Sequence, residues 1–466
     1  MKRNSIKIAL SVILGFVVAA SSVAQTINSS YFIDGSFDKH LLNPALTPER
    51  GYISLPVLGG YSLTLNSNVG LSNFLYESKT NPGMLTTFMS SEIDKNRFMQ
   101  SLPDVSQIDM ALDMELLTLG FKAFGGFNTI SMSMKNRETI SIPQQMFGFM
   151  KASLSDGNYL IEDVNVNSVT YLETSLGHSH KITDNLTVGA KLKFLTGVAY
   201  ADANINQLKA NVSEQSWVVN ANVEMRATAT GVTITTNTAE EGEIEEIEAE
   251  VLYQGASSTG FAFDMGALYD MSDLVDGLSV SASVTDIGGI KWKDMVVGKT
   301  KNEDIVFDGF DNYDVLGGHD DETTEIDQLE DDFKEMIKLY EAPSETQKIN
   351  IGATIRVGAE YTLPFADWIS VGELFTCRMG LRKYTESRTS VVLSPTKWFD
   401  LSGNVAFTST YGTVLGFVVN LHPAGFNLFL ASDGVKATLN PQMIPVSEFG
   451  ANIIMGVKIP VGKRLY

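Results

Sequence analysis

Residues 349–361 read INIGATIRVGAEY, a stretch in which every second side chain is apolar or aromatic. The odd-numbered positions carry Ile, Ala, Val or Tyr, and the even-numbered positions carry Asn, Gly, Thr, Arg or Glu. Because successive side chains of a β-strand point to opposite faces, this stretch predicts a strand with one apolar and one polar face. It exceeds the roughly 5 to 6 residues of a typical soluble strand and matches the roughly 9 to 11 that cross a bilayer. We therefore expect it to separate lipid from a polar interior.

The same alternation recurs at 186–200, 261–269 and 451–461, so the pattern belongs to the whole chain. A soluble β-sandwich also alternates apolar and polar faces, and the period alone leaves that alternative open. After residue 50 no apolar stretch is long enough for a transmembrane helix. The connections between the alternating segments decide between the two β architectures.

Long and short connections follow one another along the chain, as they do in outer-membrane barrels. The long ones are expected to be external loops near 67–107, 136–165, 201–258 and 289–348. The short ones lie at 122–125, 181–185, 271–276, 364–367 and 394–397. Together they predict an all-β fold, an antiparallel transmembrane β-barrel of about 14 strands over residues 53–466. The alternating segment 217–227 leaves about 16 strands as an alternative; we favour a hairpin outside the membrane because residues 240–250 are too acidic for lipid.

Tryptophan placement agrees with a membrane barrel. Trp292, Trp368 and Trp398 fall at the predicted strand ends. Tryptophan is enriched where a barrel meets the membrane–water interface. We expect these three side chains to belong to interfacial girdles.

The first residues predict an export signal. Lys2, Arg3 and Lys7 precede the apolar run 8–18, and small residues follow at 22–24. This arrangement is typical of a secretory signal peptide, here residues 1–24, that is cleaved from the mature protein. The run is shorter than the roughly 20 residues of a membrane anchor. We expect export and localisation in the outer membrane, where the barrel contacts lipid.

Charge and cysteine content exclude several functions. The chain has 55 acidic and 34 basic residues, a net charge of −21, which makes nucleic acid an improbable partner. The acidic residues concentrate near 240–250 and 303–345. A solvated acidic loop is favoured there over a calcium site, because the spacing lacks an EF-hand pattern. Cys377, the single cysteine, has no disulfide partner within the chain.

The sequence predicts no enzyme, cofactor or metal site. His178 and His180 lie two residues apart, so they share one face of a strand. A histidine pair can bind a metal ion, but the sequence places no third ligand beside it. No serine motif accompanies either histidine, so we expect no catalytic residue.

Residues 25–52 precede the first strand and hold Asn43, Pro44 and Ala45 in the turn-rich run 41–48. The prolines prevent a regular central strand. This segment could fold back into the barrel as a plug, with Asn43, Pro44 and Ala45 as plug or gating candidates. An ordinary periplasmic tail with a turn is the alternative.

Three pieces of the sequence carry a family resemblance. They are Asn43-Pro44-Ala45, Asp184-Asn185-Leu186-Thr187-Val188-Gly189, and Gly260-Phe261-Ala262-Phe263-Asp264-Met265-Gly266 with Val284-Thr285-Asp286-Ile287-Gly288 and Trp292 after it. Together they resemble the FadL-type transporters of hydrophobic compounds and the related PorV-like barrels. Across most of its length the chain looks most like an uncharacterised Bacteroidota family within that group. The resemblance implies about 14 strands and an N-terminal plug.

Two functions follow from the resemblance. The first is a FadL-like channel for a small hydrophobic compound, with the charged residues Lys191, Lys193, Arg356 and Glu360 facing a wet lumen. The alternative is a PorV-like barrel that serves protein secretion or surface attachment through its external loops. An amphipathic helix predicted at 326–340 would suit such a secretion or surface protein.

Overall fold

The computed structural model describes residues 28–54, 56, 59–151, 157–213, 217–238, 242–251, 258–307, 337–380, 383–410, 412–436 and 449–462. The expected signal peptide lies outside these ranges, as does most of the helix predicted at 326–340. Among the described residues no helix has both the length and the apolarity to cross a membrane.

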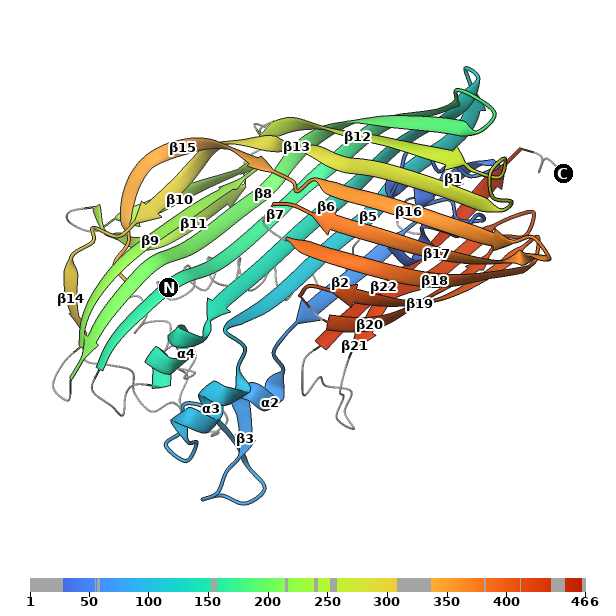
Figure 1. The fold of residues 1–466 in the computed structure, drawn as a ribbon. Helices are drawn as coiled ribbons and strands as arrows, with labels where there is room; N and C mark the ends of the chain where they lie inside the picture. Colours follow the sequence, from blue (N-terminus) through green and yellow to red (C-terminus); the bar gives the residue numbers. More distant parts are fainter. Residues whose placement is uncertain are drawn as a thin grey trace.

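Fourteen antiparallel strands close into a barrel (Figure 1), which confirms the predicted fold class. The first strand consists of β1 (Gly51–Ser54) and β2 (Tyr61–Ser67), which pair with the same two neighbours. The others are β5 (Val105–Ala123), β6 (Gly126–Pro143), β7 (Gly157–Lys181), β8 (Leu186–Val212), β12 (Thr259–Asp270), β13 (Leu278–Lys299), β16 (Thr354–Leu363), β17 (Ala366–Arg378), β18 (Tyr384–Thr396), β19 (Phe399–Thr408), β20 (Gly412–Leu421), β21 (Asn427–Lys436) and β22 (Phe449–Val461). Since β22 pairs with β1 and β2, the barrel closes.

The predicted short connections all lie at one end of the barrel, called here the short-turn end. Between β5 and β6 only Phe124 and Gly125 remain outside the strands, with φ angles of 56° and 74°. Two consecutive positive φ angles make a type I′-like turn, whose twist matches that of the paired strands. The opposite end is the long-loop end.

Within the described residues, strands extend into three of the predicted external loops, 136–165, 201–258 and 289–348. β7 has 25 residues, β8 has 27 and β13 has 22. The prediction ended each strand where its apolar face ends. Backbone pairing continues beyond that point, where apolar side chains such as Leu208 and Val212 of β8 are buried in the cluster with α4.

The region 201–258 adds a hairpin and no spanning strand. β9 (Trp217–Ala229) pairs with the far half of β8, beyond the part that pairs with β12. The outer sheet next to β9 also contains β10 (Val232–Thr238), β11 (Ile244–Val251) and β14 (Asp304–Phe307). A separate two-stranded sheet consists of β3 (Leu75–Glu77) and β4 (Leu85–Thr87). The count of 14 strands is thus preferred over 16.

The stretch 349–361 is interrupted, which the alternation did not predict. β15 (Tyr340–Asn350) pairs with the far half of β13, and β16 starts only at Thr354. Gly352 between them has a φ angle of 94°, which a residue with a Cβ atom rarely adopts. The strands that form the barrel wall therefore differ in length. On one side, β6 to β9 extend past the ends of β16 to β21 and make that side of the wall higher (Figure 1).

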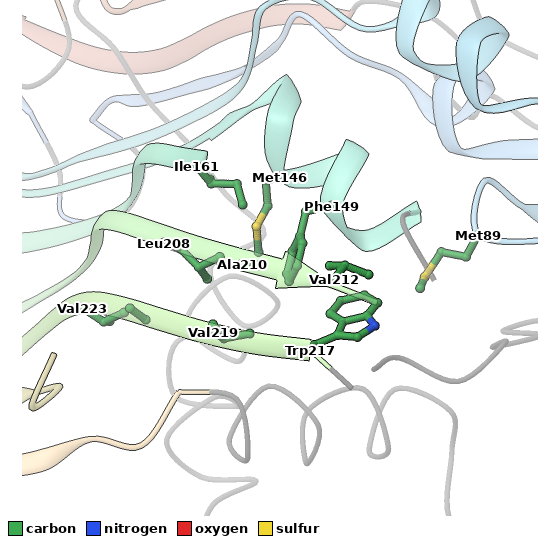
Figure 2. Packing of buried hydrophobic residues seen from close by; sticks show 11 residues of the cluster. Met89, Met146, Phe149, Ile161, Leu208, Ala210, Val212, Trp217, Val219 and Val223 are labelled. Carbon is green, nitrogen blue, oxygen red and sulfur yellow. The ribbon is translucent and has the colours of Figure 1, made fainter. Parts of the chain in front are cut away.

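The long-loop end carries a helical region with its own apolar core. It contains α2 (Leu71–Phe74), α3 (Lys95–Ser101) and α4 (Gln144–Met150). The rings of Phe88 and Phe98 stack with centroids 4.6 Å apart. Figure 2 shows Met146 and Phe149 of α4 over β8 and β9, near Leu208 and Trp217. These contacts attach the helices to the high wall.

The two faces of the barrel have inverted polarity relative to a soluble protein. On β8, Leu192 is 55% exposed on the outer face, while Lys191 and Lys193 are buried. The outer faces of β12, β16 and β22 are apolar as well. Trp368 and Trp398 are exposed at strand ends, as expected for an interfacial girdle. Trp292 is buried within β13, so its assignment to a girdle was wrong.

Candidate functional site

Residues 28–50, called here the inner segment, lie against the inner faces of strands from all around the barrel. Their contacts reach β8, β12, β13 and β16 to β22. The segment contains two single-turn 3-10 helices, η1 (Asn28–Ser30) and η2 (Lys39–Leu41). Because it contacts strands on opposite sides of the barrel, this segment and the wall around it form the candidate site.

Charged groups of the wall anchor the start of the inner segment. The backbone N–H groups of Asn28 and Ser29 donate to the Asp433 carboxylate at 2.9 and 2.6 Å. The Arg356 guanidinium donates to Asn28 Oδ1 at 3.0 Å, and the Arg388 guanidinium donates to Ser29 Oγ at 3.0 Å. Hydrogen bonds with one charged partner are stronger than neutral ones, so this end is firmly held.

Asn43 holds the predicted turn in place. Its Nδ2 group donates to the Tyr31 hydroxyl at 3.0 Å and to the carbonyl oxygens of Ala267 and Ala282, each at 3.3 Å. Its Oδ1 atom accepts from the Ala45 N–H at 3.0 Å, as in an Asx-turn. One side chain therefore fixes both the turn and its distance from β12 and β13.

Glycines of the wall make room for this turn. A Cβ atom on Gly266 would overlap Asn43 Oδ1, and one on Gly189 would overlap the Pro44 backbone. Glycine is the residue that permits such an approach of another chain segment. The two glycines belong to the sequence pieces quoted with Asn43-Pro44-Ala45, so these pieces meet in space.

Ion pairs hold the middle of the inner segment. Lys458 of β22 pairs with Asp38 and lies 3.2 Å from Glu115 of β5. Lys191 Nζ lies 3.4 Å from both Nδ1 and the backbone oxygen of His40, whose Nε2 is 2.6 Å from the Tyr52 hydroxyl. Lys458, Lys191 and His40 are buried, and removing one partner of a buried pair is costly.

An apolar cluster accompanies these polar contacts. Tyr31, Phe32, Ile33, Leu42 and Leu46 of the inner segment pack against side chains of β17, β18, β20 and β21. Beside the segment, a cavity of about 80 Å³ is bounded by Leu41, Leu42, Phe429 and Ile454 and by polar residues of β5 and β6. The lumen beside the segment thus offers an apolar surface to a small molecule.

The four charged residues expected in a wet lumen do lie on the inner face, but they are engaged with other groups. Lys193 lies 2.9 Å from Asp264, 2.6 Å from Asp286 and 3.7 Å from Glu173. Glu360 accepts a hydrogen bond from Ser370 at 2.7 Å. Lys191 and Arg356 contact the inner segment, so all four have structural partners.

Several residues of this site have no signal in the sequence that predicts their role. Asp264 and Asp286 appear in the quoted pieces of sequence, yet their pairing with Lys193 joins three strands and has no local signal. Asp286 has a φ angle of 63°, beside an irregularity in the pairing of β12 with β13. Tyr31 stands alone in the sequence, and only the fold brings it to Asn43.

The histidine pair lies apart from this site. The rings of His178 and His180 stack at 5.8 Å near the short-turn end of β7, and His178 Nδ1 lies 3.0 Å from Asn128 Oδ1. Within the described ranges no three His, Cys, Asp or Glu side chains are placed to hold a metal ion. The pair gains no third ligand there.

Comparison with known proteins gives one family and several structures. The chain has no match among curated protein sequences. It is similar to the toluene transporter TodX of P. putida, with 10% identity, 96% of each chain covered and a TM-score of 0.39. It is also similar to a FadL homologue of Pseudomonas aeruginosa, with 11% identity, coverage of 94% of this chain and 99% of that one, and a TM-score of 0.43. A family model matches residues 44–433, and the chain therefore belongs to the family of unknown function DUF5723.

Proposed function

We propose that this protein is an outer-membrane channel that admits a small apolar compound past the inner segment. Residues 1–24 direct its export and are removed, and residues 28–48 act as a plug. The observation that carries the proposal is the position of the inner segment, which is bonded to wall strands on several sides of the lumen. A barrel of about 14 strands is wide enough to need filling or to conduct.

The outer surface supports a place in lipid. Large apolar side chains are exposed along the outer faces of many strands, among them Phe261 at 63% and Met455 at 52%. Covering such a surface with hydrocarbon is favourable by roughly 25 cal/mol per Å² of apolar area. A water-soluble protein rarely exposes so large a contiguous apolar surface.

The surroundings of the inner segment support an apolar cargo. Leu41, Leu42, Phe429 and Ile454 face the cavity beside it, and the adjoining cluster around Phe32 is apolar as well. The ionic groups of the wall are engaged in pairs, so they present little unpaired charge to a passing molecule. This combination suits a compound with little charge better than a hydrated ion.

Deletion of residues 28–48 tests the proposal. The variant should assemble as a heat-modifiable barrel in detergent and show raised single-channel conductance in planar bilayers, together with faster entry of a small apolar solute such as toluene into proteoliposomes. Deletion of residues 78–84, which connect β3 to β4, serves as the control and should leave conductance unchanged. An assembled deletion of 28–48 with the conductance of the complete protein would overturn the plug and, with it, the channel.

The location has its own test. Membrane fractionation should place the mature chain in the outer membrane without residues 1–24. Recovery of the folded protein as a soluble monomer would contradict the proposal.

A further inference from the structure

A second cavity lies on the inner side of the wall, away from the 80 Å³ cavity. It measures about 30 Å³ and sits where β6, β7 and β13 face the break between β15 and β16 and the end of β17. One water molecule needs roughly 10 to 15 Å³ of such volume, which is the space open to the centre of a water-sized sphere. The space therefore fits a group the size of a carboxylate. Met379, one of the lining residues, is 44% exposed, so the lining reaches the surface.

Two buried hydrogen-bond donors at this cavity have no acceptor. Trp292 is 1% exposed, and its indole Nε1 has no hydrogen-bond partner within the described part of the chain. The same holds for Nε of Arg137, although the Nη1 group of this guanidinium is paired with Asp113 at 2.6 Å. Indole and guanidinium N–H groups can only donate. Leaving them buried without an acceptor costs free energy, so both point to an acceptor that binds here.

The charged groups that line this cavity are all cationic. Among the described residues that line it are two guanidinium groups, Arg137 and Arg378, and not one carboxylate. Its remaining surface includes the apolar side chains of Ile290, Ile349 and Ile351. Asp113 pairs with Arg137 from outside the lining, which leaves the indole N–H and the Nε–H of Arg137 as donors. Such donors suit an oxyanion, and the isoleucines suit an apolar body attached to it.

We propose that this cavity binds the oxyanion group, of carboxylate or phosphate type, of a small compound whose apolar part lies along the isoleucines. Trp292 Nε1 and Arg137 Nε donate to the oxyanion, and Arg378 balances its charge. The inference deepens the proposed function, on which it rests for the route by which the compound arrives, because it adds an anionic group to the apolar cargo.

Three probes of matched size, benzoate, benzyl alcohol and benzylamine, together with inorganic phosphate separate the possible ligands. Binding is measured by calorimetry on the complete barrel in lipid nanodiscs, together with the indole ¹H–¹⁵N resonances. Trp292→Phe keeps the ring packing, assigns the resonance and removes the N–H donor. Trp398→Phe, at an exposed strand end, is the matched control.

Benzoate should bind, shift the Trp292 indole proton downfield, and lose about tenfold in affinity in Trp292→Phe, the usual scale for a hydrogen bond to a charged group. Benzyl alcohol and benzylamine should bind more weakly than benzoate by at least the same factor. Equal binding of benzyl alcohol, or an unmoved indole resonance, would overturn the oxyanion. Binding of phosphate as tight as that of benzoate would overturn the organic ligand and leave a site for free inorganic anions.

Whether benzoate binds at Trp292 does not depend on whether the barrel conducts. Calorimetry needs no transport, so benzoate binding at Trp292 with unchanged conductance of the 28–48 deletion would retain the site and refute the plug. If the 28–48 deletion raises conductance but benzoate does not bind, the plug is retained and the oxyanion site is refuted.

Discussion

The side-chain amide of Asn43 donates to the Tyr31 hydroxyl across 3.0 Å, and the same hydroxyl lies 3.0 Å from Ser281 Oγ of β13. This chain of contacts joins the two halves of the inner segment to each other and to the wall. Both Tyr31 and Asn43 are buried, so the bonds are shielded from water.

Asn43→Ala should raise single-channel conductance part of the way toward that of the 28–48 deletion. The substitution removes the bonds to Tyr31, Ala267, Ala282 and Ala45, and each buried neutral hydrogen bond contributes roughly 0.5 to 1.5 kcal/mol. Planar-bilayer recordings measure the change. Asn128→Ala is the control, because Asn128 contacts β7 and the β5–β6 turn and not the inner segment. Equal conductance of the Asn43 variant and the complete protein would show that the turn is not what holds the segment.

Gly266→Ala should destabilise the barrel by roughly 1 to 3 kcal/mol, the usual cost of overpacking. The new methyl group would overlap Asn43 Oδ1, which its own bonds hold in place. Gly403→Ala is the matched control, since a Cβ atom there meets nothing within 4 Å. Urea unfolding in lipid vesicles gives both free energies. A Gly266 variant as stable as the Gly403 variant would mean that the turn is free to move away.

Val357→Arg should impair assembly, whereas Val357→Leu should not. Val357 is 51% exposed on the outer face of β16. Arginine facing lipid near the middle of the bilayer costs roughly 2 to 4 kcal/mol, and leucine in the same place costs nothing comparable. The folded fraction follows from heat-modifiable migration. Equal assembly of the two variants would mean that this face does not meet lipid.

Lys193→Met should lower stability by roughly 3 to 5 kcal/mol, because it leaves Asp264, Asp286 and Glu173 without their shared cation. Adding Asp264→Asn should restore part of the loss. Lys181→Met, at an exposed position of β7, is the control. A Lys193 variant that is stable but altered in ion selectivity would assign this lysine to conduction and not to structure.

Acid should loosen the outer sheet between β9 and β15. Hydrogen bonds from Arg226 and Lys299 hold the pKa of Glu345 below its ordinary value of 4.5. A lowered folded-state pKa means that the contribution to stability is complete above 4.5 and is lost as the pH falls through the lower value. Amide exchange in β15, corrected for its intrinsic pH dependence, measures the loss. Glu345→Gln should remove this dependence, and its persistence in that variant would exclude Glu345 as the cause.

The barrel was predictable from the sequence because its determinants are local. Alternation at 186–200 and 451–461 records which side chains meet lipid, and the short turns record where the chain reverses. The heights of β7 and β8 were not predictable in this way, because Leu208 and Val212 continue the alternation of β8 beyond the lipid, where they belong to the apolar cluster with α4. The period alone does not distinguish an apolar face that meets lipid from one that packs against helices. The break at Gly352 was missed because glycine fits an alternating pattern as well as it fits a positive φ angle.

The site was predictable only in part, for a related reason. Asn43, Pro44, Lys191 and Lys193 attract attention as residue types. Their partners Tyr31, Gly266 and Asp264 look ordinary, because the contacts that give them a role join positions far apart in the chain. The helix predicted at 326–340, which would suit the alternative role in secretion, lies mostly outside the described residues, so that role stays a prediction.

The unequal height of the wall has a consequence for how anything reaches the mouth. At roughly 3.3 Å per residue, a strand like β7 with 25 residues runs about 80 Å, whereas one like β20 with 10 runs about 33 Å. A molecule that diffuses along the membrane from the direction of β20 meets a low rim, and one from the direction of β7 meets a standing sheet. For the proposed channel, capture at this mouth is therefore directional, and in a crowded membrane it depends on which neighbour occupies the low side.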